Sequence, residues 1–303
     1  MPPHLDKLNA VLENAKLPVS DRPAIEAAKK RYREWAAQMD QVKETQDKRI
    51  DQLVRLLNDY RLYLDVDVIF DSEADFLYRQ KGQLKLDNSV IEEFLPWLIC
   101  PAVIPELKGL DIAVGPVSSY SSLFFKSSLE NPLHGGGLSI RSKDQDFAIS
   151  RPLYIKASHS KAFDEGRCQT ETTSITYVAA ECKTNLDKTM FQEACATARD
   201  TKFAVAGAKY YLLVEWLDMT PLSTAATDID EVLILRKAKR VNSNVRSEYA
   251  VREKRRAHRQ AYIDNLKANP FSPDVFRRFV QHVAKLLRNE APEERNVLRQ
   301  GYF

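Results

Sequence analysis

Glu181 and Lys183 stand two positions apart at the end of an apolar run, SITYVAAECK, and their side chains could bind a metal ion and a phosphate group. The run is rich in β-branched and small apolar residues, which predicts a strand. Side chains two apart in a strand point to the same face of a sheet, so this carboxylate and this ammonium are expected to share one face. The alternative is an ordinary solvated strand end.

An acidic residue two positions before a lysine is a weak pattern by itself, because this chain contains it three times. Residues 106–108 lie in a turn that contains Pro and Gly, and residues 200–202 lie in a polar segment after a predicted helix. Only residues 181–183 end an apolar strand. This context favours a functional role for Glu181 and Lys183.

A second carboxylate, Asp146, begins another apolar run, DFAISRPLYIKA, which predicts a strand that ends near Ala157. A polar loop of about residues 158–172 connects the two predicted strands. If the strands pair antiparallel as a hairpin, the start of the first lies beside the end of the second. Asp146 would then lie next to Glu181, although 35 residues separate them in the sequence.

Two carboxylates, Asp146 and Glu181, would supply the oxygen ligands that Mg²⁺ prefers, and the backbone carbonyl of Cys182 would be a further metal ligand. Lys183 would orient the attacking water or neutralise the negative charge that develops on the phosphate. This combination of groups is suited to the hydrolysis of a phosphodiester.

The order of these features resembles the PD-(D/E)XK nuclease core: Asp146 at a strand start, AAECK at the end of the next strand, and the helix-forming segment LDKTMFQEACATAR directly after it. More narrowly, GLDIAVGPVSSYSSLFF, SKDQDFAIS, AECKTNLDKTMFQEA and YYLLVEWLDM resemble the BbvCI-like type II restriction endonucleases, which cut CCTNAGC-type sites. The resemblance covers about residues 108–236. It implies an α/β fold in which a mixed central β-sheet is flanked by helices.

The resemblance also implies that Asp146 and Glu181 are the metal ligands and Lys183 the catalytic lysine of a Mg²⁺-dependent enzyme. Such an enzyme cuts double-stranded DNA and leaves 5′-phosphate ends. Because one site cuts one strand, a second subunit is implied as well, in a homodimer or a heterodimer. Gln145 stands where the family name has Pro, so Asp144 and Asp111 remain alternatives for the first carboxylate.

Basic residues gather in RKAKRVNSNVRSEYAVREKRRAHR, residues 236–259, although the formal net charge of the whole chain is only +3. Such a cluster favours contacts with DNA phosphates and with guanine edges. The alternative is a solvated helix face beside acidic neighbours. The candidate DNA-binding residues are Arg246, Arg252, Arg255, Arg256 and Arg259.

Helical periodicity dominates both ends of the chain. Residues 20–64 predict one long helix, or two helices broken near residues 43–48 that fold back as a hairpin or pack on a partner chain. Further helices are expected at residues 4–17, 88–100 (with Asp87 as N-cap), 187–199 (with Asp187 as N-cap) and 272–288. The expected division is a helical N-terminal region (1–104), a nuclease core (105–240) and a basic helical C-terminal region (241–303).

The composition indicates a globular protein, with 44% hydrophobic residues and only 9 Gly. No long apolar run is present, which predicts that the chain does not span a membrane, and the charged N-terminal segment predicts a cytoplasmic protein. The four Cys and five His residues form no zinc or disulfide pattern. SSYSS lacks a GxSxG motif and HGGGLS lacks the Lys of a phosphate-binding loop, which argues against a serine hydrolase and a P-loop enzyme.

Two other functions remain open. The same core could belong to another DNA nuclease, one that nicks DNA in repair or resolves junctions. Alternatively, the chain could be a non-catalytic DNA-binding protein with an accidental Glu181-x-Lys183 pattern. A neighbouring DNA methyltransferase gene would favour the restriction enzyme. Lys183→Ala would abolish cleavage but not DNA binding if the protein is a nuclease.

Overall fold

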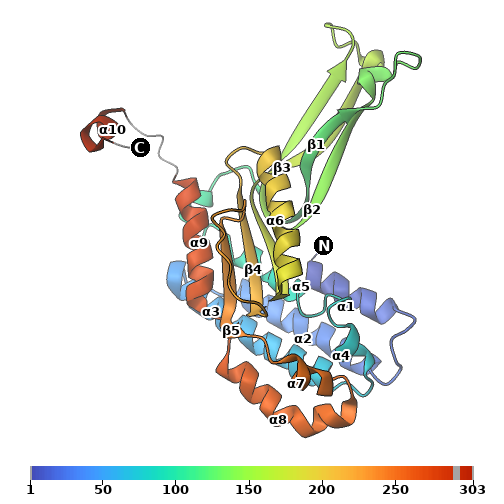
Figure 1. The fold of residues 1–303 in the computed structure, drawn as a ribbon, viewed down its shortest axis with the longest axis vertical. Helices are drawn as coiled ribbons and strands as arrows, with labels where there is room; N and C mark the ends of the chain where they lie inside the picture. Colours follow the sequence, from blue (N-terminus) through green and yellow to red (C-terminus); the bar gives the residue numbers. More distant parts are fainter. Residues whose placement is uncertain (1, 289–293, 302–303) are drawn as a thin grey trace.

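The computed structural model describes residues 2–288 and 294–301 and contains a five-stranded mixed sheet flanked by helices (Figure 1). The strand order is β1-β2-β3-β4-β5, with β2 antiparallel to both β1 and β3, and with β3, β4 and β5 parallel. This arrangement confirms the mixed sheet expected from the sequence. The strands are β1 (Ala113–Phe125), β2 (Leu138–Ser158), β3 (Cys168–Leu186), β4 (Lys209–Leu217) and β5 (Glu231–Lys239).

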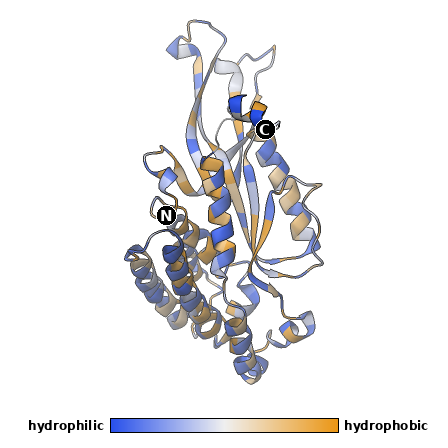
Figure 2. Cartoon of the chain, turned by 90° about the vertical axis from the view of Figure 1, so that its left-hand side faces the viewer, coloured by the Kyte–Doolittle hydropathy of each residue, from blue (hydrophilic) through white to orange (hydrophobic). Residues whose placement is uncertain are grey.

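The helices precede and follow the sheet along the chain, except α6 (Lys188–Ala204), which connects β3 to β4. The helices before the sheet are α1 (Pro3–Glu13), α2 (Arg22–Asp40), α3 (Gln46–Tyr63), the π-helix Leu64–Phe70, α4 (Phe76–Gln80) and α5 (Ser89–Leu98). After β5 come α7 (Ser243–Glu248), α8 (Arg252–Ala268), α9 (Pro273–Leu287) and α10 (Glu294–Gln300). The helices carry both polar and apolar residues, as expected of elements with one buried face (Figure 2).

Most of the predicted helices agree with the structure, and α9 covers residues 273–287 of the expected 272–288. The long apolar pattern of residues 20–64 forms two helices, α2 and α3, which are broken at residues 41–45 and pack against one another. Asp187 caps α6, since its carboxylate accepts a hydrogen bond from the Met190 backbone N–H at 2.9 Å. At α5, however, the N-cap is Asn88, and Asp87 instead accepts a hydrogen bond from the Asn88 N–H.

The sheet is covered on both faces, and this explains the uninterrupted apolar run of β4. Tyr210, Leu212 and Val214 point to the α6 side, where they meet buried α6 residues such as Ala194 and Ala198. Small side chains on α6 allow the helix to approach the sheet closely. The intervening residues of β4 point to the opposite face, toward the N-terminal helices and α9.

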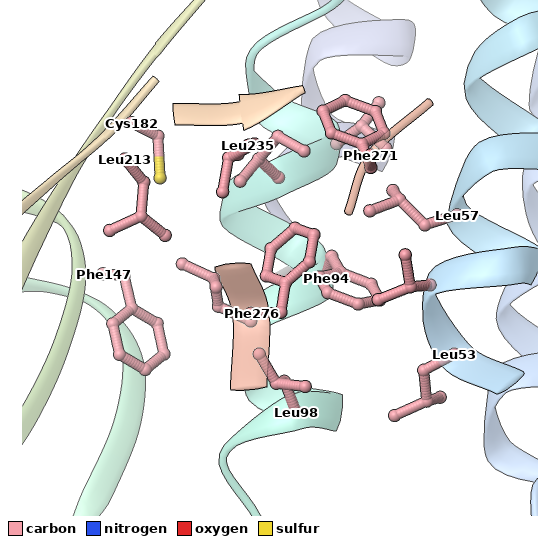
Figure 3. Close-up of a cluster of buried hydrophobic side chains, with 14 of the residues drawn as sticks. Leu53, Leu57, Phe94, Leu98, Phe147, Cys182, Leu213, Leu235, Phe271 and Phe276 are labelled. Carbon is pink, nitrogen blue, oxygen red and sulfur yellow. The ribbon is translucent and has the colours of Figure 1, made fainter. Parts of the chain in front are cut away.

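The larger core joins the N-terminal helices to the sheet. Figure 3 shows Phe94 and Phe276, whose rings pack edge to face at 5.0 Å, between the α3 residue Leu57 on one side and the strand residues Cys182 and Leu213 on the other. The core therefore continues without interruption across residues 104 and 105, where the composition of the sequence changes.

β2 is longer than predicted and strongly bent. It begins at Leu138, eight residues before Asp146, because its polar first half pairs with β1. Gln169 pairs with Ala157 near one end of β2 and also donates a side-chain hydrogen bond to the Leu138 carbonyl at its other end, at 2.5 Å. The two ends of β2 therefore meet, and the distal parts of β1, β2 and β3 form an arm that projects from the body (Figure 1).

Candidate active site

The site lies where the pairing between β2 and β3 ends. The β2–β3 ladder ends at the pair Phe147–Ala180, whereas the β3–β4 ladder continues to Leu186. Extending the β2–β3 register by one residue sets Asp146 opposite Glu181, so the hairpin that the sequence predicts is confirmed. β3 does not end at Lys183 as expected, but from Glu181 onward its β2 side is open.

A proline on the neighbouring strand accompanies this opening. Gly115 pairs with Ala148 and Val117 pairs with Gln145, so two residues of β2, Asp146 and Phe147, stand opposite Pro116 alone. Such a bulge inserts an extra residue and redirects the strand, and Pro has no N–H to donate to a regular ladder.

The two bulge residues point into different environments. The side chain of Phe147 is fully buried in the larger core, whereas that of Asp146 remains 20% exposed. The bulge thus supplies one hydrophobic core residue and one carboxylate at adjacent positions of the chain.

Cys182 lies beyond the last β2–β3 pair, so β2 supplies no backbone partner for its N–H and carbonyl groups. Two side chains form these hydrogen bonds instead. The Cys182 N–H donates to Asp146 Oδ2 at 3.0 Å, and the Cys182 carbonyl accepts from Asn88 Nδ2 at 2.9 Å. The Cys182 side chain is buried, and this burial raises the pKa of its thiol well above the ordinary value. Its backbone carbonyl, rather than its sulfur, is therefore the group available to the site.

Glu181 is held from two directions. Lys183 Nζ lies 2.7 Å from Glu181 Oε1, which confirms that the two side chains share a face, and the Tyr210 hydroxyl donates to Glu181 Oε2 at 2.5 Å. Burial disfavours the charged form of Lys183, but the hydrogen bond and charge of Glu181 outweigh it and hold the lysine pKa above its ordinary value. Burial, together with the Glu181 charge, also raises the pKa of Tyr210. Lys183 is therefore a cation at neutral pH.

Three further site residues come from α5 and the turn before it, and the sequence analysis did not identify them. Lys85 Nζ lies 3.3 Å from Asp146 Oδ1 and 3.5 Å from Glu92 Oε1, and Asn88 Nδ2 donates to Glu92 Oε1 at 3.0 Å. Burial and the nearby Asp146 charge raise the pKa of Glu92. Asn88 and Glu92 stand four apart at the start of the predicted helix, and this polar pair was the available signal, whereas Lys85 precedes that helix.

Lys85, Asn88, Asp146 and residues 181–183 line one cleft of about 730 Å³, whereas Glu92 is buried and is not among the lining residues. Asp144 also lines the cleft but is exposed, whereas Asp111 is exposed before β1 and is not among the lining residues. Of the three candidates for the first carboxylate, Asp146 is the one that is hydrogen-bonded to the backbone of the 181–183 segment.

A buried ionic network forms the floor of the cleft and connects the helices to the sheet. Arg61 Nη2 lies 3.1 Å from Asp65 Oδ2 and 3.0 Å from Glu215 Oε1, and Arg236 Nε lies 3.3 Å from Glu215 Oε2. All four side chains are less than 5% exposed. The Arg236 guanidinium also stacks 3.9 Å from the ring centre of Phe271. Because the charges are paired, they can remain buried.

The five arginines proposed to bind DNA occupy different environments. Arg246 lies on the cleft wall, where it donates to the Val241 carbonyl at 2.8 Å. Arg252 pairs with Glu73, Arg259 pairs with Asp71, and Arg256 is exposed on α8.

Arg255 was expected to lie on the surface and bind DNA, but the structure places it in the interior. Its side chain is 1% exposed and donates hydrogen bonds to the carbonyl oxygens of Phe70, Ser72, Ala74 and Tyr249 and to the Asp75 carboxylate. A guanidinium that is buried and fully engaged in this way cannot reach a base edge, so Arg255 holds α8 against the π-helical segment.

The residues present fit a hard divalent ion. The carboxylates of Asp146 and Glu181 line the same cleft and offer oxygen ligands, and each is balanced by an ammonium group. Within residues 2–288 and 294–301, no three His, Cys, Asp or Glu side chains form a group that could hold a metal ion. Two carboxylates with water and phosphate oxygens are nevertheless a usual set for Mg²⁺.

In the described part of the chain, every helix is too short or too polar to cross a bilayer.

Comparisons with known proteins agree with this architecture. The structure is similar to that of the native BbvCI A2B2 tetramer, with a TM-score of 0.56 and 20% sequence identity over 88% of this chain and 98% of the BbvCI chain. This likeness shows a restriction-endonuclease-like α/β fold. None of the curated protein sequences matches the chain. A family model described as Bpu10I restriction endonuclease matches residues 83–303, well over half of the sequence. The chain therefore belongs to the Bpu10I restriction endonuclease family.

Proposed function

We propose that the protein is a type II restriction endonuclease with a PD-(D/E)XK site that hydrolyses double-stranded DNA in a Mg²⁺-dependent reaction and leaves 5′-phosphate ends. The observation that carries the proposal is that Asp146, Glu181 and Lys183 line one cleft. They come from two strands, β2 and β3, whose distal parts form the long arm. Family membership supports cleavage of DNA, and the donor set supports the metal.

Each side chain has a distinct part in this proposal. Asp146 and Glu181 would hold the ion, with the Cys182 carbonyl as a further ligand that is oriented by Asn88. Magnesium, when bound, would stabilise charge on the phosphoryl oxygens and lower the pKa of a bound water. Lys183 would orient that water or neutralise the transition-state charge from its position beside Glu181. Tyr210 would fix the Glu181 carboxylate in place.

DNA would lie across the mouth of the cleft. Lys143, Arg240 and Arg246 line the cleft and would contact phosphates, and Arg256 would extend this surface along α8. We infer that a second subunit acts with this chain, because the described site provides the parts for cutting a single strand. The arm carries exposed aromatic side chains, including Phe125 (59% exposed) and Tyr154 (71% exposed), which are suited to contacts with a partner.

The proposal is tested by incubating unmethylated plasmid DNA with wild-type protein and with Lys183→Ala, with and without Mg²⁺. Lys188→Ala is the matched control, because Lys188 is exposed at the start of α6. Wild-type protein and the control should give discrete Mg²⁺-dependent products, and Lys183→Ala should be slower by about 10²-fold or more while it still retards DNA in a gel.

If the protein acts as a heteromer, the single chain gives nicked plasmid and the assembled enzyme gives linear fragments. A wild-type protein that binds DNA but neither nicks nor cuts it, alone or with its partner subunit, would identify a DNA-binding protein and contradict the proposal. Nicking confined to mismatches or junctions would favour a repair nuclease with the same core.

A further inference from the structure

Lys85 joins two carboxylates that belong to different layers of the protein. Its ammonium lies 3.3 Å from Asp146 on β2 and 3.5 Å from Glu92 on α5. Glu92 is buried, with a side chain 6% exposed, so its carboxylate has little access to water. A cation between the two acids offsets their mutual repulsion, which would otherwise act at short range in a poorly solvated place.

The backbone at Lys85 is adapted to this position. Lys85 has φ of +50°, a left-handed conformation that is unfavourable for a residue with a Cβ atom. Its carbonyl accepts hydrogen bonds from the Ser89 hydroxyl at 2.6 Å and from the Ser89 N–H at 3.2 Å. The Ser89 hydroxyl is hydrogen-bonded in turn to the buried His4 ring at 2.9 Å. Buried hydrogen bonds therefore hold the backbone of Lys85, and strained conformations that are maintained in this way concentrate at functional sites.

Both oxygens of Asp146 are engaged. Oδ2 accepts the Cys182 backbone N–H, and Oδ1 faces the Lys85 ammonium. Each carboxylate oxygen keeps a second lone pair, so a divalent ion can bind Asp146, but an ion at Oδ1 would lie close to the Lys85 ammonium and repel it. The Cys182 N–H belongs to a central strand that remains paired with β4, so it cannot leave without disrupting the sheet. The Lys85 side chain is 43% exposed and ends in the cleft, so it can rotate away.

We propose that Lys85 is an internal counter-ion that neutralises the Asp146–Glu92 pair before the divalent ion arrives and is displaced from Asp146 Oδ1 when the ion binds. Lys85 thereby lowers the affinity of the site for the ion and keeps the empty site ordered. The inference rests on the proposed function, because it takes Asp146 as a metal ligand.

The test is calorimetric titration of wild-type protein and variants with Ca²⁺ and Mn²⁺ in the absence of DNA. Lys85→Met removes the charge at similar length, Lys85→Arg keeps the charge, and Lys188→Met removes an exposed charge at the start of α6, outside the lining of the cleft. Lys85→Met should bind the ion about tenfold more tightly or better, since a unit charge a few ångströms from the ligand no longer competes. Lys85→Arg and Lys188→Met should bind the ion with an affinity near that of wild type.

Equal or weaker ion binding by Lys85→Met would overturn the inference, because Lys85 would then organise the ligands or play no part in binding. Ion binding that is absent from wild type and from Lys85→Met alike would instead contradict the proposed metal site. The two failures are therefore distinguishable.

A second measurement uses wild-type protein and does not depend on the folding of a variant. Acetylation of lysines with an amine-reactive ester, followed by mass spectrometry, reports the accessibility of each ammonium group. Labelling of Lys85 should rise severalfold when Ca²⁺ is added, while labelling of Lys143 stays constant. Unchanged or reduced labelling of Lys85 at saturating Ca²⁺ would contradict its displacement.

Discussion

The backbone N–H of Cys182 donates to Asp146 Oδ2 at 3.0 Å, so a carboxylate from β2 completes the edge of β3 just beyond the last pair of their ladder. This contact ties the position of Asp146 to the backbone of the segment that carries Glu181 and Lys183. The candidate site is consequently held by the sheet rather than by a mobile loop, which is a requirement for precise placement of catalytic groups.

Tyr210→Phe tests whether the hydroxyl of Tyr210 positions Glu181. The ring is fully buried in the core beneath α6, so the substitution keeps the packing while it removes the hydroxyl and its 2.5 Å hydrogen bond to Glu181. We expect divalent-ion affinity and cleavage rate to fall by about 10-fold to 100-fold, as for other groups that orient a metal ligand. Calorimetric titration with Mn²⁺ and single-turnover cleavage measure the two effects.

The control for this prediction is Tyr154→Phe, because Tyr154 is 71% exposed on the arm. It should bind the ion with wild-type affinity. A Tyr210→Phe variant with unaltered ion affinity and rate would show that Lys183 alone suffices to hold Glu181.

Glu215→Gln tests the buried network beneath the cleft. The substitution removes a carboxylate that lies 3.0 Å from Arg61 and 3.3 Å from Arg236, and it leaves two buried guanidinium groups with one acid between them. The free energy of unfolding should fall by about 3–5 kcal/mol, as it does when one partner of a buried ion pair is removed. Urea denaturation followed by circular dichroism measures the change.

Glu34→Gln provides the comparison, because Glu34 and its partner Arg31 are each nearly half exposed. Its effect should stay below about 1 kcal/mol. A loss of similar size in both variants would mean that the network contributes no more than a surface pair.

His4 makes the stability of the protein depend on pH. The ring is fully buried and hydrogen-bonded to Ser89 and Tyr60, and burial, together with the Arg61 charge, lowers its pKa from 6.5 to about 3. The unfolded chain binds a proton below pH 6.5 that the folded protein does not, so stability should fall as the pH drops from 6.5 toward 3. The contribution of one such group is about 1.4 kcal/mol per pH unit.

The difference in unfolding free energy between wild type and His4→Gln isolates this contribution from that of the carboxylates. We expect the difference to favour wild type most at pH 7.5 and to shrink steadily between pH 6.5 and pH 4.5. A difference that is constant over this interval would rule out the lowered pKa.

Substitution of the adjacent arginines Arg255 and Arg256 on α8 should affect different properties, the stability of the fold and the affinity for DNA. Arg256→Ala removes an exposed charge, so it should weaken DNA binding and reduce the slope of log affinity against log salt by about 0.9 without changing the unfolding midpoint. Arg255→Ala removes buried hydrogen bonds to the Phe70 and Ala74 carbonyls, so it should destabilise the fold.

Fluorescence anisotropy over a range of salt concentrations and thermal unfolding measure the two effects separately. Arg256→Ala with wild-type DNA affinity at every salt concentration would exclude that part of α8 from the DNA-binding surface.

The sheet and the strand part of the site could be predicted because local patterns encode them. The apolar runs predict the strands and the β2–β3 hairpin. The antiparallel pairing of these two strands then places Asp146 beside Glu181. The start of β2 was missed because its first half, SIRSKDQ, is polar and pairs with β1 along the exposed arm, where no apolar period is required.

Lys85, Asn88 and Glu92 could not be assigned to the site from the sequence. Charged and polar residues at helical spacing usually form a solvated face, and only the tertiary packing of α5 against the sheet turns this face toward Asp146. Arg255 shows the reverse case, since a basic run gave no sign that one of its members is buried. Burial of a charge depends on partners distant in the sequence, here Asp75 and the π-helical segment.

The uninterrupted core between the N-terminal helices and the sheet has an evolutionary consequence. The N-terminal region contributes Arg61, Lys85 and Asn88 to the lining of the cleft, so we do not expect it to be exchanged as an independent module by gene fusion or recombination. Diversification of relatives built on this plan is therefore expected to concentrate in the projecting arm and the outer loops, while the helical layer and the sheet change together.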